Sequence, residues 1–159
     1  MWRQQLAVFS EKYCCVTVTL PNYGGTQSEL GGLDFPEIVD RLHEVVLSVT
    51  EKEVILVTHD WGAYIGYLYE KQWPEYVFAM VAMDVGGHVS LKKVSWALMF
   101  VSYQWSLICF WLLGGLIPPL GTWLTRKFAF LLRVPRRQAS SLLSRCNYPY
   151  FYFWRANLV

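Results

Sequence analysis

The hydrophobic positions in the first half of the chain alternate between continuous apolar runs and helical repeats. Residues 54–57 and 77–83 are apolar runs, which are typical of strands covered on both faces. Hydrophobic residues at helical spacing follow Asp34 and also fill 62–73, so each of these segments predicts a helix. Asp34 suits the N-cap, and Pro36 is acceptable in the first turn. This order predicts an α/β domain with a parallel sheet.

A further strand is predicted near the N-terminus. Residues 13–20 are rich in β-branched and aromatic side chains and stop at Pro21. A weak helical pattern over 2–11 precedes them, and the segment 21–34, which holds four glycines, predicts a loop after them. The expected sheet therefore has about three parallel strands.

The pattern changes after residue 90, where only helices are predicted. Trp96–Ile117 has 22 residues without a charge, which is long enough for a transmembrane helix. Ser102 and Gln104 within it favour the alternative of a buried or interfacial helix, and both interpretations stay open. The N-terminus has no apolar run, so no signal peptide is expected. The sequence predicts a cytoplasmic or peripheral membrane protein.

Composition and charge narrow the class of protein. The chain of 159 residues is 54% hydrophobic and 17% aromatic, which excludes a disordered chain. All 12 acidic residues lie at or before Asp84, whereas 85–159 hold nine basic residues and no acidic one. The basic residues are spread among Trp, Leu and Phe, so we expect a membrane face and no nucleic-acid partner. The four cysteines have no metal-ligand spacing, and no metal site is expected.

Candidate chemistry lies in the segment His59-Asp60-Trp61-Gly62, directly after the apolar run 54–57. A strand that turns sharply into a helix can lift the side chain at the turn above the sheet edge, as in a nucleophile elbow. The N–H of the next residue, Trp61, would then point at developing negative charge. The alternative is that Asp60 only caps the following helix. Spacing alone does not separate the two.

The H-D-W-G segment and its flanks resemble the α/β-hydrolase superfamily, and within it the epoxide hydrolases and haloalkane dehalogenases. The resemblance implies a partial hydrolase core over 1–90 and an incomplete helical cap over 91–159. Thr58 stands where the family usually has Gly. The family's upstream His-Gly-x-Pro loop and its downstream catalytic His are not found. The chain is therefore expected to be an internal piece of a longer enzyme, with little turnover on its own.

The resemblance also implies roles for particular side chains. Asp60 would attack an epoxide carbon to form an alkyl-enzyme ester, and the N–H of Trp61 would belong to the oxyanion hole. Tyr103, in the context Tyr103-Gln104-Trp105, resembles the proton donor of the cap, and core packing is its alternative. Asp84 matches the position of a catalytic acid in one dehalogenase subgroup. A turn-capping role is the alternative for Asp84.

Other candidates are weaker. Further possible proton donors are Tyr148, Tyr150 and Tyr152. His59 points away from Asp60 on an elbow, and His88 has no following acid to orient it, so neither is expected to be the catalytic base.

Three functions remain open from the sequence. The first is an epoxide hydrolase-like enzyme acting on a small lipophilic substrate. The second is a haloalkane dehalogenase, in which the Trp61 indole would hold the halide. The third is a non-catalytic, membrane-associated remnant of a hydrolase. No cofactor is implied, and the oligomeric state is open.

Overall fold

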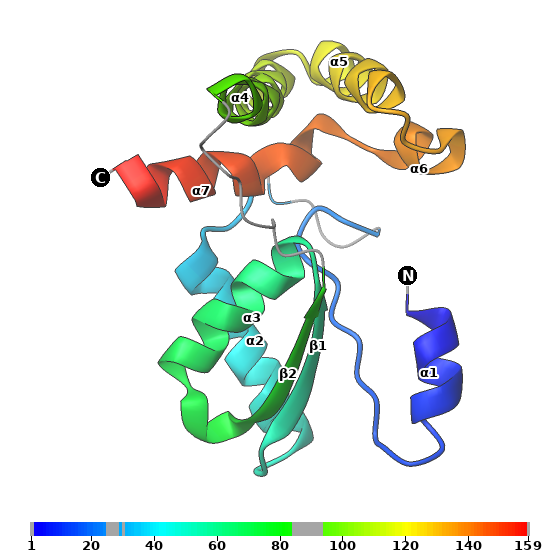
Figure 1. Ribbon diagram of the computed structural model, residues 1–159, viewed down its shortest axis with the longest axis vertical. Helices are drawn as coiled ribbons and strands as arrows, with labels where there is room; N and C mark the ends of the chain where they lie inside the picture. Colours follow the sequence, from blue (N-terminus) through cyan, green and yellow to red (C-terminus); the bar gives the residue numbers. More distant parts are fainter. Residues whose placement is uncertain (1, 25–28, 30, 84–93, 159) are drawn as a thin grey trace.

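The computed structural model describes residues 2–24, 29, 31–83 and 94–158, and it has two parts (Figure 1). The first is a small α/β unit, and the second is a helical layer, α4 to α7, that lies across one end of it. The expected partial α/β core followed by a helical region is therefore confirmed. The helices and strands are α1 (Arg3–Phe9), α2 (Phe35–Val49), β1 (Val54–His59), α3 (Trp61–Gln72), β2 (Val77–Met83), α4 (Val94–Leu116), α5 (Pro118–Leu131), α6 (Arg136–Ser141) and α7 (Tyr148–Leu158), with short 3-10 turns at Pro74–Tyr76 and Ser144–Asn147.

The sheet consists of β1 and β2, which pair in parallel and are connected through α3. The helices α2 and α3 pack on one face, where Val54 and Leu56 join the hydrophobic core. On the other face Val57 is 41% exposed and Phe78 is 70% exposed. Among the described residues, the strands are therefore covered on one face only, and the expectation of cover on both faces is wrong for this part of the chain.

The strand predicted over 13–20 is absent. Residues 14–20 have no regular secondary structure, and the described sheet has two strands. Tyr13, Val16 and Val18 are each about half exposed. Strand propensity largely reflects packing against neighbouring strands and burial of one face. These side chains have little such packing, so their β-branched character does not produce a strand here.

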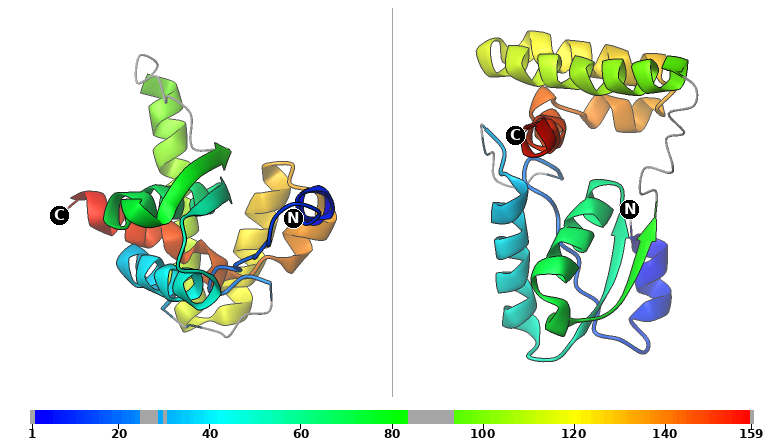
Figure 2. Two further views of the ribbon diagram at one scale, coloured as in Figure 1. Left: turned by 90° about the horizontal axis from the view of Figure 1, so that it is seen from below. Right: turned by 60° about the vertical axis from the view of Figure 1, so that its left-hand side comes forward.

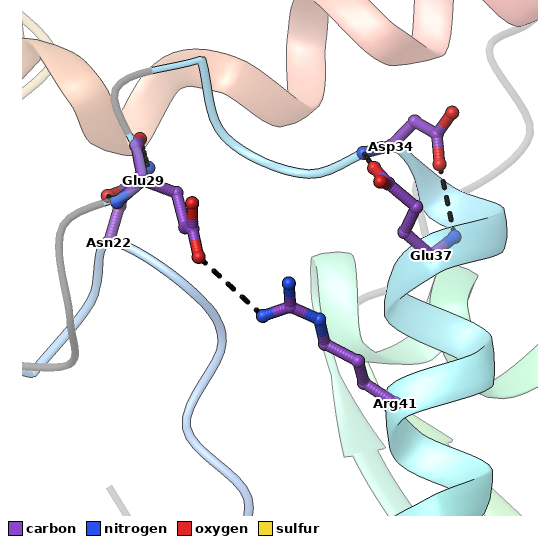
Figure 3. Close-up of polar contacts among 5 residues, drawn as sticks. All are labelled: Asn22, Glu29, Asp34, Glu37 and Arg41. Atoms are coloured by element: carbon purple, nitrogen blue, oxygen red, sulfur yellow. Dashed lines mark hydrogen bonds and ion pairs between the residues drawn. The ribbon is translucent and has the colours of Figure 1, made fainter.

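Polar contacts shape the loop that leads into α2, as Figure 3 shows. Asp34 Oδ1 accepts a hydrogen bond from the Glu37 amide at 3.0 Å, and Glu37 Oε2 accepts one from the Asp34 amide at 3.0 Å. This capping box confirms the predicted N-cap. Upstream, the Asn22 side chain exchanges two hydrogen bonds with the backbone of Glu29. The exposed Arg41–Glu29 ion pair, at 3.7 Å, adds little stability.

The helices α4 and α5 form a hairpin, and α7 lies between it and the α/β unit (Figure 2). Gly114 and Gly121 bring the two helices of the hairpin together, because a Cβ at Gly121 would lie 2.5 Å from the Gly114 nitrogen. At the start of α7, Tyr148 is fully buried in the core of the α/β unit. The helical layer is thus attached to the α/β unit through α7.

The close approach of α4 and α5 gives a test of this packing. Gly121→Ala should destabilise the protein by about 1–3 kcal/mol, because the new Cβ overlaps the backbone of Gly114. Gly115→Ala is the matched control, since a Cβ there meets nothing within 4 Å. That control should stabilise the helix by about 0.5–1 kcal/mol. Urea unfolding of both variants measures the difference, and equal effects would contradict the packing.

Candidate active site

The turn between β1 and α3 holds Asp60 in a strained backbone conformation. Asp60 has φ 53° and ψ −125°, a region that residues with a side chain rarely adopt. Its amide donates to the carbonyl of Met83 at 3.1 Å, and its carbonyl accepts from the amide of Ala63 at 2.9 Å. These bonds tie the turn to both neighbouring elements. Such strain costs about 1–3 kcal/mol and is concentrated at functional sites.

The Asp60 carboxylate does not cap α3, since the helix has no side-chain hydrogen bond at its N-cap. In contrast, the Asp34 carboxylate caps α2 in the ordinary way. Trp61 is the first residue of α3, so its N–H has no acceptor within the helix. The turn therefore presents a carboxylate and a backbone donor at the positively polarised end of a helix.

Thr58, at the expected glycine position, is accommodated by the neighbouring helix. Its methyl group faces Gly66 of α3, where a Cβ would lie only 3.1 Å from it. Gly66 on the helix thus leaves the space that the Thr58 side chain needs.

A cavity of about 200 Å³ lies between the β1–α3 turn and the helical layer. It brings together three residues that the sequence predicts for the site, namely Asp60, Trp61 and Tyr103. Of the other candidate tyrosines, Tyr150 lines this cavity. The complete lining is Tyr23, Asp60, Trp61, Tyr103, Leu107, Thr125, Phe128, Ala129, Leu132, Val134, Leu142, Cys146, Asn147 and Tyr150.

Two tyrosine hydroxyls meet in the cavity wall. The hydroxyls of Tyr103 on α4 and Tyr150 on α7 are 2.5 Å apart. Burial raises the pKa of both above the usual value, and the nearby Asp60 carboxylate raises the pKa of each further. The Tyr150 ring also packs edge-on against Trp61, with ring centroids 5.0 Å apart. Both hydroxyls therefore stay protonated at neutral pH and can donate a proton.

The sequence patterns did not single out three polar residues of the cavity wall, which are Tyr23, Thr125 and Asn147. The Tyr23 hydroxyl donates to the Cys146 carbonyl at 2.7 Å, and burial raises the pKa of Tyr23 well above its usual value. The Asn147 amide donates to Thr125 Oγ1 at 3.0 Å. Thr125 and Asn147 are polar side chains in the largely apolar part of the chain after residue 90, and this contrast could have marked them as candidates.

The remaining candidates lie elsewhere. Asp84 and His88 fall outside the described residues, so their predicted roles stay predictions. His59 ends β1 and, like the third histidine, His43, does not line the cavity. Tyr148 is buried in the core and Tyr152 donates to the carbonyl of Gly31 at 3.2 Å. Within the described residues, no cluster of three His, Cys, Asp or Glu side chains is placed to hold a metal.

Comparison with known proteins identifies the family. The model of the alpha/beta hydrolase family matches residues 1–158. The chain belongs to the alpha/beta hydrolase family. No solved structure matches it.

Three curated relatives are epoxide hydrolases by name. This alpha/beta hydrolase is 26% identical to epoxide hydrolase 1 of Caenorhabditis elegans over 101 residues, which is 60% of this chain and 25% of that protein. It is 26% identical to human epoxide hydrolase 4 and 28% identical to mouse epoxide hydrolase 3, each over 85 residues. Those matches cover 52% of this chain and 24% and 23% of the relatives. The resemblance predicted from the sequence is confirmed, and the match spans about a quarter of each relative.

The buried tyrosines predict how stability depends on pH. Tyrosines of the unfolded chain ionise near pH 10, whereas the pKa values of Tyr103 and Tyr150 are raised in the folded protein. Their contribution to stability is present below pH 10 and is lost as the pH rises towards the folded values. Urea midpoints should therefore change little between pH 8 and 10 through these groups and fall as the pH rises above 10.

Tyr150→Phe should make this fall shallower, because it removes one ionisable group. At pH 8 the tyrosines are protonated, so the urea midpoint of the variant at that pH measures only the loss of the hydrogen bond between the two hydroxyls. The change of the midpoint at higher pH then measures the titration. An unchanged slope in Tyr150→Phe and in Tyr103→Phe would contradict the assignment.

Proposed function

We propose that this protein is a hydrolase of the epoxide hydrolase type, with Asp60 as its nucleophile. The supporting observation is that the carboxylate-bearing turn and the Tyr103–Tyr150 pair line one cavity. Protonation of the departing oxygen speeds the opening of an epoxide by a carboxylate, because an alkoxide is a poor leaving group. The site offers the nucleophile and the acid together.

The proposed step is the formation of an ester. A carboxylate oxygen of Asp60 attacks an epoxide carbon, the C–O bond of the ring breaks, and its electron pair goes to the oxygen. That oxygen takes a proton from Tyr103 or Tyr150, whose raised pKa values keep them protonated until the alkoxide forms. The N–H of Trp61 is proposed to stabilise oxyanion charge when the ester is later hydrolysed. No described histidine lines the cavity, so no base that activates water for this hydrolysis is proposed among the described residues.

The tyrosine pair favours an epoxide over a haloalkane as substrate. Halide is a stable leaving group and needs no proton donor, whereas an alkoxide does. The similarity to relatives named as epoxide hydrolases supports the same choice. Seven of the lining residues have largely apolar side chains, which suits a small lipophilic substrate, and they are Trp61, Leu107, Phe128, Ala129, Leu132, Val134 and Leu142.

We also propose the two-part organisation and a membrane-associated location. Residues 1–90 would be the hydrolase core and 91–159 the helical cap over its site. The segment Ala97–Leu116 is long and apolar enough to cross a membrane, and only 17% of it is buried. Peripheral association is favoured over a span, because Gln104 accepts a hydrogen bond from the Trp154 indole at 2.7 Å and so fixes α4 to α7.

Ester trapping tests the nucleophile. Brief exposure to a lipophilic epoxide such as styrene oxide should add the mass of the epoxide to the peptide that contains Asp60. Asp60→Asn should give no adduct, because the amide is not nucleophilic. Asp40→Asn is the matched control, since Asp40 is an exposed carboxylate on α2, and it should leave the adduct unchanged. Mass spectrometry of the digested protein reads both results.

The proton donors have their own expected effect. Tyr103→Phe combined with Tyr150→Phe should slow the formation of the adduct by about 10²-fold or more, as loss of a general acid does, and each single variant should slow it less. An adduct on Asp60→Asn, or an unreactive wild-type protein, would contradict the proposal.

A further inference from the structure

The hairpin of α4 and α5 has an exposed apolar surface. Its most exposed hydrophobic side chains are Leu116, at 82%, Leu131, at 75%, and Leu98, at 65%, and Trp123 is 55% exposed. Figures 1 and 2 show the hairpin as the layer farthest from the sheet. We call this surface the outer face, and it consists of Leu98, Met99, Leu112, Leu116, Ile117, Leu120, Trp123, Phe130 and Leu131.

The outer face follows the helical repeat. Along α4 the exposed residues Leu98, Leu112 and Leu116 of the outer face are separated by whole numbers of heptads or helical turns, so they share one side of the helix. The buried residues of the same helix, Gln104, Leu107 and Ile108, point to the opposite side. The helix is thus apolar on the side that solvent reaches, where a helix of a soluble protein is usually polar.

The inner side of α4 is held to its neighbours by polar and aromatic contacts. Gln104 Oε1 accepts a hydrogen bond from the Trp154 indole at 2.7 Å, and the hydroxyls of Tyr103 and Tyr150 are 2.5 Å apart. The Phe128 ring of α5 stacks on Tyr103, with ring centroids 6.0 Å apart. A helix that crossed a bilayer alone would lose these contacts. The hairpin can meet lipid with its outer face only if it lies flat.

The charges around the outer face have one sign. Lys127 lies 5.8 Å from the ring centroid of Trp123, and Arg133 is exposed just after α5, whereas α6, with the exposed Arg136 and Arg137, lies below the hairpin (Figure 1). The sequence has no acidic residue after Asp84. Basic side chains beside an apolar surface match anionic lipid headgroups, which attract the charges while the acyl chains receive the apolar side chains.

We propose that the outer face of the α4–α5 hairpin docks in the plane of an anionic lipid bilayer. The leucines and Trp123 enter the boundary between headgroups and acyl chains, and the basic side chains contact the headgroups. Tryptophan is favoured at this depth because its ring is amphipathic.

The docking also bears on how substrate arrives, and this part rests on the proposed function. Leu107, Thr125, Phe128 and Ala129 of the same two helices line the cavity. A lipophilic epoxide dissolved in the bilayer would therefore be one layer of helices away from Asp60. Lipid binding itself does not depend on that chemistry, so it is tested without any turnover.

Vesicle flotation tests the docking surface. The protein should float with vesicles of 70% phosphatidylcholine and 30% phosphatidylserine, and the bound fraction should fall when the salt is raised, because screening weakens the charge attraction. Leu116→Glu with Leu131→Glu should reduce binding about tenfold or more, since each removes apolar surface and adds a repelled charge. Phe78→Glu is the matched control, because Phe78 is 70% exposed on the open face of the sheet. That control should bind like the wild type.

A site-specific probe gives a second measurement. Cys109 is exposed on α4 between Trp105 and Leu112, and Cys14 is exposed near the N-terminus. An environment-sensitive dye on a variant that keeps only Cys109 should shift to shorter wavelength with anionic vesicles. The same dye on a variant that keeps only Cys14 should not. Circular dichroism of each variant checks that it is folded.

Several results would overturn the proposal. Binding that Phe78→Glu weakens as much as the hairpin variant would indicate general stickiness. Resistance to extraction with alkaline carbonate would indicate a spanning helix. A lipid-free dimer that Leu116→Glu with Leu131→Glu dissociates would show a second copy as the occupant of this face.

Discussion

The contact between Tyr148 and Gly32 determines where the helical layer lies on the α/β unit. Tyr148 is fully buried in the core, and Gly32 has φ +70° and leaves no room for a Cβ, which would lie 2.6 Å from the Cβ of Tyr148. Because α7 begins at Tyr148, this contact fixes the first turn of that helix. Tyr150, only two residues later, then reaches the cavity beside Asp60. The geometry of the candidate site thus depends on a glycine that has no part in its chemistry.

Buried hydrogen bonds give the helical layer a defined register. The hydrogen bond between Gln104 and Trp154 links α4 to α7. The hydrogen bond between Asn147 and Thr125 links the turn before α7 to α5. Apolar packing alone tolerates small shifts, whereas a buried amide without its partner costs about 1–3 kcal/mol. These pairs therefore favour one arrangement of the layer, and in that arrangement the Tyr103 and Tyr150 hydroxyls meet.

Local features could be predicted from the sequence, and features set by packing could not. The capped helix after Asp34 and the strand at 77–83 have strong local patterns, and the structure has both. The segment 13–20 has a strand-like composition, but its neighbours decide whether it pairs. Asp60 and Trp61 are adjacent in the sequence, so one motif predicts both. Tyr150 could not be separated from Tyr148 and Tyr152, because the docking of α7 decides which ring faces the cavity.

The small side chains on α5 connect the two roles proposed for the hairpin. Gly121, Thr125 and Ala129 recur every four residues and are buried against α4 and the turn before α7. Bulkier residues there would push α5 away and open the cavity wall that Thr125 and Ala129 help to form. Phe128 of α5 also faces inward and lines the cavity, whereas Trp123 and Leu131 are left exposed on the outer side. One helical repeat therefore produces both a tight cavity wall and an apolar surface suited to lipid.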